Sequence, residues 1–208
     1  GNGHINDTFL LTYDTPDGVR KYILQRMNHT IFKNPQALME NISRVTDYLR
    51  QGIIRRGGDS ERETLNVIRT AGGDSYYQDS AGNYWRMFLF IEDTICLDQV
   101  ENPEEFYDSA VAFGSFQRML ADYPAHTLHE TIPNFHNTPS RFQDFCKAVK
   151  RNASGRAHLV QQEIDFALSK ESDTHVLTDL LARGELPLRV THNDTKLNNI
   201  SFDRSRRK

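Results

Sequence analysis

The spacing of apolar residues changes near residue 92, and this change limits the folds that the chain can adopt. Before it, short apolar runs alternate with turn-forming residues, which is typical of β-hairpins. After it, apolar residues recur every three or four positions, which is typical of amphipathic helices. The predicted elements are hairpins over 8–27 and 75–91, a strand over 64–70, and helices over 34–52, 102–124, 140–150, 155–170 and 173–183. This order predicts an α+β fold with a small antiparallel sheet lobe (residues 1–95) and a mainly helical lobe (residues 96–208).

Two of the predicted helices carry clear start signals. Asn34 and Asn102 are each followed by a proline, so each asparagine can cap a helix whose first position is the proline. In the first of these helices, apolar residues from Leu38 to Leu49 form one stripe, and Gly52 is the expected end. Further along, the apolar segment before His192 predicts a strand that leads into a polar loop.

The bulk composition excludes several classes of partner. A formal net charge of -3 gives no strong positive field, so neither nucleic acid nor an anionic membrane is an expected partner. The basic cluster over residues 204–208 is expected to be a solvated tail or turn. Cys96 and Cys146 form no C-x-x-C pair, and no apolar run approaches the ~18 residues that a membrane span needs. A cytoplasmic location is therefore expected.

A polar cluster over residues 190–199, VTHNDTKLNN, is the strongest candidate for a reaction centre. Written as H-x-D-x-K-x-x-N, it contains His192, Asp194, Lys196 and Asn199. Such residues could simply form a turn. They also supply what phosphoryl transfer from ATP needs: a carboxylate for the attacking hydroxyl, a cation for the phosphoryl charge and an oxygen ligand for magnesium. His192 is then expected to bond backbone carbonyls and hold the loop in shape.

The start of the chain offers a second element of a nucleotide site. Gly1 and Gly3 lie just before the first predicted hairpin, and glycines allow backbone N–H groups to approach an anion closely. Two glycines are weak evidence alone. Together with the downstream loop, they predict a segment over the nucleotide phosphates.

Across nearly its whole length the chain resembles the aminoglycoside phosphotransferase and choline kinase superfamily, and within it the N-acetylhexosamine 1-kinases. The resemblance is carried by GNGHINDTF, YILQRMN, NPQALMENI, FHNTPSRF and HNDTKLNNI. It implies a protein-kinase-like fold and phosphorylation of the anomeric hydroxyl of GlcNAc or GalNAc with ATP and Mg²⁺. It further implies that Asp194 is the catalytic base, Lys196 a phosphate contact and Asn199 a metal ligand. His4 and Asn6 would face either the sugar or the phosphates.

Two positions depart from the pattern of protein kinases. Arg26 stands where those enzymes have a nucleotide-binding lysine, and it is predicted to bind the nucleotide and to pair with Glu40. The second acidic metal ligand is also not evident, because Asp203 is too close to Asn199 and is expected at a turn. We therefore expect a C-terminally truncated chain that is a poor catalyst alone.

Several alternatives remain open within this framework. The acceptor could be another hydroxyl compound, such as choline or an aminoglycoside, or the chain could be a non-catalytic sugar-binding pseudokinase. A carbohydrate-binding module is disfavoured, because alternation in a buried hairpin explains the aromatic residues around Trp85 better. Some relatives of this kind are named mucin-desulfating sulfatases. Sulfatases need Cys or Ser in C/S-x-P-x-R, whereas NTPSR here has Asn137, which cannot become formylglycine.

Three histidines in one loop, His126, His129 and His136, could suggest a zinc hydrolase. The loop contains prolines and lacks the H-E-x-x-H helix, so loop or pocket histidines are the better interpretation. His136 and Arg141 are candidates for the sugar side of the site.

Overall fold

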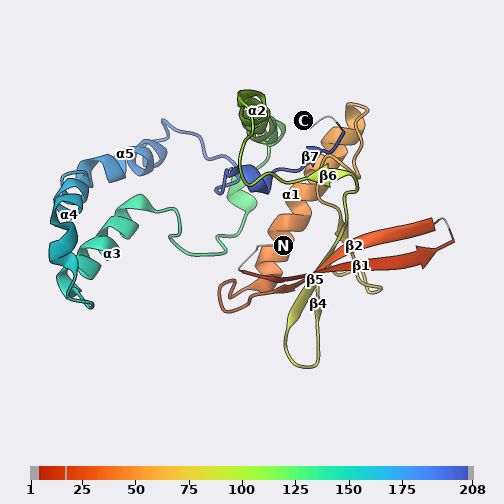
Figure 1. The fold of residues 1–208 in the computed structure, drawn as a ribbon, viewed down its shortest axis with the longest axis horizontal. Coiled ribbons are helices and arrows are strands. Elements are labelled where there is room, and N and C mark those ends of the chain that lie inside the picture. Colours follow the sequence, from red (N-terminus) through yellow and green to blue (C-terminus); the bar gives the residue numbers. More distant parts are fainter. Residues whose placement is uncertain (1–4, 17, 206–208) are drawn as a thin grey trace. The chain divides into compact units, whose positions relative to one another are not determined.

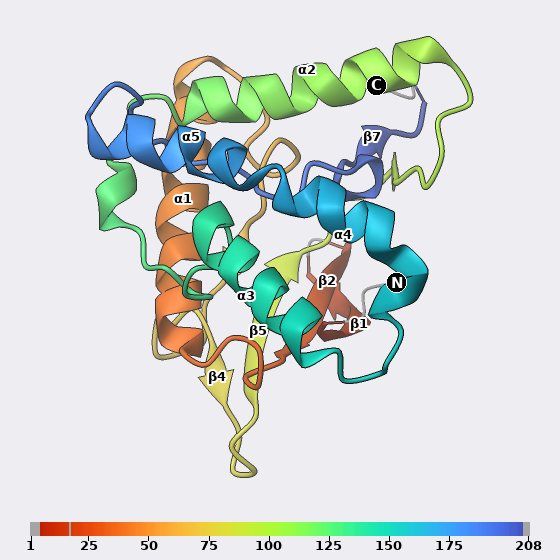
Figure 2. The same ribbon diagram turned by 90° about the vertical axis from the view of Figure 1, so that its left-hand side faces the viewer.

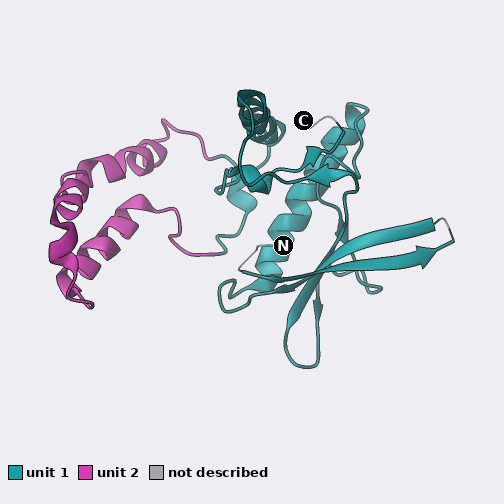
Figure 3. Ribbon diagram, in the orientation of Figure 1, with its two compact units in different colours: residues 1–131, 189–208 teal, residues 132–188 magenta. Residues whose placement is uncertain are grey.

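A computed structural model describes residues 5–16 and 18–205 of the chain, and it is an α+β protein with a small antiparallel sheet and helices (Figure 1). It forms two compact units (Figure 3). Unit 1 comprises residues 1–131 and 189–208, and unit 2 comprises residues 132–188. The lobe boundary predicted near residue 95 stays a prediction. None of the helices in the described ranges is long and apolar enough to cross a membrane.

The main sheet of unit 1 confirms both predicted hairpins. Its strands are β1 (Asp7–Thr15), β2 (Gly18–Met27), β3 (Val67–Ile68), β4 (Tyr77–Gln78) and β5 (Tyr84–Leu89). They pair antiparallel in the order β1-β2-β5-β3, and β4 pairs with the first residues of β5. The strand predicted over 64–70 shrinks to β3.

The two faces of this sheet have different neighbours. Side chains that pair directly across antiparallel strands lie on the same face. Ile23 pairs with Phe88, and Gln25 pairs with Arg86, whose guanidinium reaches Met39 of helix α1 (Pro35–Arg55). This is therefore the α1 face, and Figure 2 shows α1 beside the sheet. Phe88 and Met39 are buried there. The register places Leu24, Trp85 and Met87 on the outer face.

Helix α1 begins as predicted but ends later. The Asn34 side chain accepts a hydrogen bond from the Ala37 N–H at 3.0 Å, and Pro35 is the first helical residue. The helix continues past Gly52 to Arg55 because Ile53, which is fully buried, extends its apolar face. The left-handed residue that follows the helix is Gly57, at φ 76°.

The second helix of unit 1 completes its core. Helix α2 (Pro103–Met119) is capped by Asn102, whose side chain accepts from the Glu105 N–H at 3.0 Å. A short 3₁₀ helix, η1 (Ala125–Thr127), follows. The core brings the end of α1 against the end of α2 and the residues after it, and its buried members are Leu49, Ile53, Leu120 and Tyr123. Burial of these side chains supplies the hydrophobic stabilisation that joins the helices.

A second, two-stranded sheet connects the middle of the chain to its last described residues. Strand β6 (Thr94–Ile95) pairs antiparallel with β7 (Phe202–Asp203). Phe202 is 1% exposed, and the Arg204 N–H donates to the Asp93 carbonyl at 2.8 Å. These contacts fix the chain just after the H-x-D-x-K-x-x-N segment.

Unit 2 is helical, as predicted for this part of the chain. It contains α3 (Thr138–Arg151), the 3₁₀ helix η2 (Ala157–Val160), α4 (Gln161–Leu168) and α5 (Glu171–Ala182). Helix α3 packs against α5. Asn137, the residue that stands at the key position of the sulfatase-like NTPSR sequence, caps α3 by accepting from the Ser140 N–H at 3.0 Å. Its role here is structural.

The strand predicted before His192 is wrong. The described chain has no strand between α5 and the 3₁₀ helix η3 (Leu197–Asn199). Val190 packs against the core of unit 1 and the Arg189 guanidinium donates to the Ala121 carbonyl at 3.3 Å. Leu186 and Leu188 are exposed, so Val190 is the apolar residue of this segment that packs, and no neighbouring strand among the described residues offers it a ladder of backbone hydrogen bonds.

The turn between β4 and β5 generates a test of stability against pH. The Asp79 carboxylate accepts from the Trp85 indole at 2.8 Å and from the Asn83 side chain and backbone, and these bonds lower the pKa of Asp79 to about 2. Because the folded-state pKa lies below the ordinary aspartate value of 3.8, this stabilisation is present above that value and is lost as the pH falls toward 2. Asp79→Asn should lower Tm at pH 7 and lose this dependence on acid.

Circular dichroism melts between pH 7 and pH 2.5 measure the difference in Tm between Asp79→Asn and the wild type. Asp122→Asn is the matched control, since Asp122 is exposed and has no hydrogen bond or ion pair among the described residues. A difference in Tm that stays constant as the pH falls would contradict the role given to Asp79.

Candidate active site

The structure brings three of the predicted site residues together in one loop of unit 1. The Asn199 amide nitrogen donates to the Asp194 carboxylate at 2.7 Å and to the Asp194 backbone carbonyl at 2.8 Å. The Lys196 ammonium lies 3.5 Å from the same carboxylate oxygen. All three side chains are exposed. A carboxylate, a cation and an amide thus converge on one accessible point.

The local sequence explains this convergence. Asn193 has φ 62°, a left-handed conformation that asparagine tolerates better than most residues, and it places His192 and Asp194 on either side of a reversal. The Thr191 hydroxyl donates to the Asn193 side chain. After the reversal, the Lys196 N–H donates to the Asp194 carbonyl at 2.9 Å, and η3 turns Asn199 back toward Asp194.

The loop is attached to α2 at its start. The His192 ring lies edge-on to Phe113 and Phe116 of α2, with ring centroids 5.4 and 5.9 Å apart. The expected hydrogen bonds from His192 to backbone carbonyls are not among those of the described residues. His192 is therefore held by aromatic packing, which contributes about 0.5–1.5 kcal/mol for each good ring pair. His192 therefore contacts α2 through ring packing in place of the expected hydrogen bonds to backbone carbonyls.

A second attachment lies at the other end of the loop. The Asn198 amide donates to Asp98, just after β6, at 3.2 Å, and β7 then pairs with β6. Ser201 lies against Cys96, with its oxygen 3.8 Å from the sulfur. The side chains of Asp194, Lys196 and Asn199 therefore belong to a segment that contacts α2 at its start and β6 at its end.

The electrostatics of the loop keep the Asp194 carboxylate ionised. The hydrogen bond from Asn199 lowers the pKa of Asp194 most, and burial opposes this effect in part. The charge and hydrogen bond of Lys196 and the neighbouring His192 lower the pKa further. An ionised carboxylate can accept a proton or orient a hydroxyl group at neutral pH.

The loop also offers a ligand for a hard cation. Because the Asn199 nitrogen faces Asp194, its amide oxygen is free of hydrogen bonds among the described residues and can bind Mg²⁺, which prefers oxygen ligands and retains waters or phosphates. Asp203 is bonded to Ser205 and Arg62 instead. Across residues 5–16 and 18–205, no three or more His, Cys, Asp or Glu side chains group in a metal-binding cluster.

Several predicted residues near the N-terminus lie apart from this loop. Gly1, Gly3 and His4 fall outside the described residues. The Asn6 side chain accepts from the Asn28 N–H at 3.0 Å, which ties the entry of β1 to the end of β2. Its carbonyl oxygen is thus engaged in a structural bond, and its role toward a substrate stays a prediction.

The predicted ion pair between Arg26 and Glu40 is wrong. The Arg26 guanidinium pairs with Asp7, directly opposite on β1, where its Nε donates at 2.7 Å. Glu40 instead pairs with Arg44 and contacts the His129 ring at 2.7 Å. The sheet register explains the error, because Arg26 pairs with Trp85 and so lies on the outer face, away from α1. Binding of a nucleotide by Arg26 stays a prediction.

His136 and Arg141 come together within unit 2. They line an open cavity of about 480 Å³ with Phe135, Thr138, Phe142 and Thr174. The Arg141 guanidinium lies over the Phe135 ring, 5.4 Å from its centroid, and donates to the Phe135 carbonyl at 3.2 Å. An arginine, an imidazole and hydroxyl groups beside aromatic rings suit a polar ligand with an apolar face.

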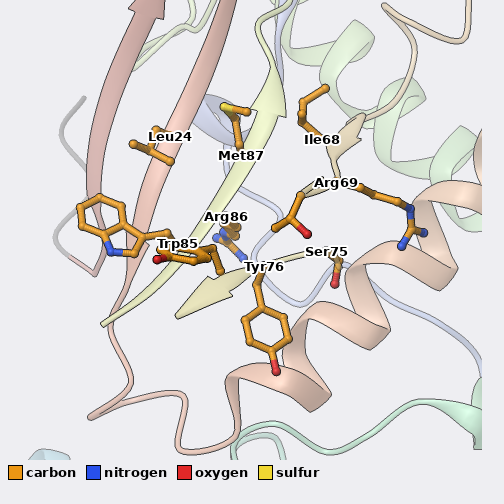
Figure 4. Close-up of a pocket in the computed structure, with 10 residues that line it drawn as sticks. Leu24, Ile68, Arg69, Ser75, Tyr76, Trp85, Arg86 and Met87 are labelled. Atoms are coloured by element: carbon orange, nitrogen blue, oxygen red, sulfur yellow. The ribbon is translucent and has the colours of Figure 1, made fainter. Parts of the chain in front are cut away.

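A second cavity, of about 320 Å³, lies against the sheet, and Figure 4 shows Leu24, Ile68, Trp85 and Met87 along it. These side chains belong to the outer face. This cavity is mostly apolar and holds none of the predicted site residues.

Arg86 of β5 is a polar side chain of the sheet that is not among the predicted site residues. It lies on the α1 face, and its Nε donates to Gln25 at 3.0 Å. In the sequence, Arg86 is a single arginine within a strand rich in aromatic residues. Alternation alone does not show which face of the sheet it lies on.

The sheet, the helices and the Asp194 loop together are compatible with a kinase-like phosphotransferase. The whole chain, residues 1–208, matches the model of the phosphotransferase enzyme family, known as APH, and the chain belongs to that family. The resemblance noted at H-x-D-x-K-x-x-N is thereby confirmed at the level of a small-molecule phosphotransferase.

The bond from Asn199 to Asp194 generates a direct test of the loop. Asn199→Ala should raise the pKa of Asp194 toward the ordinary aspartate value, because the largest stabilising contact of the carboxylate is removed. NMR titration of the side-chain carboxyl carbon measures this pKa. Asn198→Ala is the matched control, since Asn198 bonds Asp98 and should leave the Asp194 titration in place. Equal titration in Asn199→Ala and the wild type would refute the assignment.

Proposed function

We propose that this protein is an ATP- and Mg²⁺-dependent sugar kinase that transfers a phosphoryl group to the anomeric hydroxyl of an N-acetylhexosamine, GlcNAc or GalNAc. Family membership supports the phosphotransfer. The observation that carries it is the convergence of Lys196 and Asn199 on Asp194. The likeness of GNGHINDTF and FHNTPSRF to N-acetylhexosamine 1-kinases supports the choice of acceptor.

Each residue of the loop has a role in this reaction. The ionised Asp194 orients the sugar hydroxyl and accepts its proton while the oxygen bonds to the γ-phosphorus and the bond to ADP breaks. Lys196 offsets the charge that spreads over the phosphoryl oxygens. The Asn199 amide oxygen would hold Mg²⁺. When bound, the metal would supply positive charge that offsets the charge of the phosphate groups.

The first test of this proposal is the kinetics of Asp194→Asn. The asparagine keeps the size of the side chain but cannot accept the proton, so kcat should fall by about 10²–10⁴-fold or more. Production of ADP with GlcNAc or GalNAc as acceptor measures the rate, and circular dichroism confirms the fold. Asp122→Asn, at an exposed aspartate with no hydrogen bond or ion pair among the described residues, should keep the wild-type rate.

Each outcome of that assay decides a different part of the proposal. Turnover of Asp194→Asn equal to the wild type would refute the catalytic role. Faster phosphorylation of choline or an aminoglycoside than of either sugar would overturn the acceptor and retain the phosphotransfer. ATP binding without turnover of any acceptor would favour a pseudokinase.

The cavity of unit 2 gives a separate prediction about the acceptor. We propose that His136 and Arg141 bind the sugar, since both are polar groups beside the Phe135 ring. His136→Ala and Arg141→Met should each raise KM for the sugar by about 10-fold, the effect of one or two lost hydrogen bonds, while KM for ATP stays constant. Lys147→Met, an exposed cation of the same helix as Arg141, is the control. Sugar KM values unchanged in both variants would exclude this cavity.

A further inference from the structure

A row of polar side chains crosses three strands of the main sheet. Thr8 of β1, Gln25 of β2 and Arg86 of β5 pair directly across the strands. The Gln25 amide nitrogen donates to the Thr8 hydroxyl at 3.0 Å, and the Arg86 Nε donates to the Gln25 carbonyl oxygen at 3.0 Å. The two bonds fix the orientation of the Gln25 amide, because its oxygen must face the arginine.

Arg86 differs from the other cations of this sheet. On β2, Arg20, Lys21 and Arg26 each pair with a carboxylate. Among residues 5–16 and 18–205, no carboxylate lies within 4.0 Å of the Arg86 guanidinium. Its polar contacts are the neutral Gln25 amide and the Met39 sulfur, 4.0 Å from Nη1.

Burial of the Arg86 guanidinium without an anionic partner is energetically unfavourable. The Arg86 side chain is half-buried between the sheet and α1, and burial lowers the pKa of Arg86 to about 10. It therefore stays protonated at neutral pH. Amide and thioether partners do not neutralise a guanidinium, and they leave several of its five N–H donors available. A planar cation of this kind suits the oxygens of a phosphate group.

The row also connects Arg86 to the start of the sheet. Thr8 is the last residue of GNGHINDT, the segment predicted to cover the nucleotide phosphates. Asn6, two residues earlier, bonds the residue after the end of β2. The chain therefore enters β1 at the end of β2 that carries Gln25, one strand away from Arg86.

We propose that Arg86, oriented by Gln25, binds a phosphate group of ATP on the α1 face of the sheet. This inference rests on the proposed function and names a nucleotide contact that Arg26 was expected to provide. Arg26 is paired with Asp7 on the outer face, whereas the charge of Arg86 has only neutral partners. Gln25 acts as a positioning residue, because it is an acceptor that holds the guanidinium without cancelling its charge.

Two variants test the proposal through binding rather than turnover. Arg86→Met removes the charge and retains the aliphatic contacts. Gln25→Glu keeps Arg86 and gives it a carboxylate partner of the same size, so the phosphate must compete with an internal ion pair. Each should raise Kd for ATP by about 10- to 100-fold, as expected for lost charge-assisted hydrogen bonds. Isothermal titration calorimetry with ATP, adenosine and GlcNAc 1-phosphate measures the effect.

Matched controls separate this contact from a structural role. Arg20→Met, on β2, removes an exposed arginine and should leave Kd for ATP within about 2-fold of wild type, as expected for an exposed ion pair. Adenosine, which has no phosphate, should bind each variant as it binds the wild type. Tm should be unchanged or higher in Gln25→Glu, because the new pair neutralises a half-buried charge.

The possible results are distinct. The proposal would be overturned if folded Arg86→Met bound ATP with the wild-type Kd. If Arg86→Met does not fold, a wild-type Kd in Gln25→Glu would overturn it. Loss of ATP affinity in Arg26→Met but not in Arg86→Met would return the role to Arg26. Weaker binding of GlcNAc 1-phosphate with unchanged ATP affinity would move the contact to the sugar product. A wild type that binds no ATP at all would refute the proposed function itself.

Discussion

The hydrogen bonds from the Asn199 amide to the carboxylate and the backbone carbonyl of Asp194 hold the loop of the candidate active site together. They close the segment on itself, lower the pKa of the carboxylate and turn the amide oxygen of Asn199 outward. The rest of unit 1 supports this closure. Phe113 and Phe116 of α2 hold the start of the loop through His192, and β6 holds its end through β7. The exposed loop is thus held by ring contacts at its start and by a strand pair at its end.

The positively charged side chains of the main sheet differ in their partners. The cations on β2 are each neutralised by a carboxylate, whereas Arg86 has an amide partner. In protein kinases the lysine of the sheet that contacts the nucleotide phosphates is paired with a glutamate of the neighbouring helix. In this protein, the residue of helix α1 that contacts Arg86 is the buried, neutral Met39. Glu40 of the same helix pairs with Arg44 and contacts His129. A cation with neutral partners retains more of its attraction for phosphate.

Local signals were sufficient to predict much of the fold. Asn34 and Asn102 cap their helices because the capping bond depends on residues only three positions apart. The end of α1 was misplaced because the burial of Ile53 depends on Leu120 and Tyr123, far along the chain. The strand before His192 was wrong for a related reason. Val190 is apolar because it packs on the core, and the sequence cannot reveal that no neighbouring strand is available.

The candidate site divides in the same way. Asp194, Lys196 and Asn199 were predictable because one short loop holds all three. The positions of Arg86 and Gln25 were not predictable, because the register of the sheet decides which strand residues share a face with α1. A shift of one residue would move Arg26 to the opposite face. The pairing of Arg26 with Asp7 rather than Glu40 has this cause.

We propose that this loop transfers a phosphoryl group from ATP to a sugar hydroxyl. The most direct measurement is a phosphorus NMR time course of the purified protein with ATP, Mg²⁺ and GlcNAc or GalNAc. We expect a sugar 1-phosphate signal that grows in equal amount with ADP and requires Asp194. Release of inorganic phosphate at a rate independent of the sugar, with no sugar phosphate formed, would contradict it.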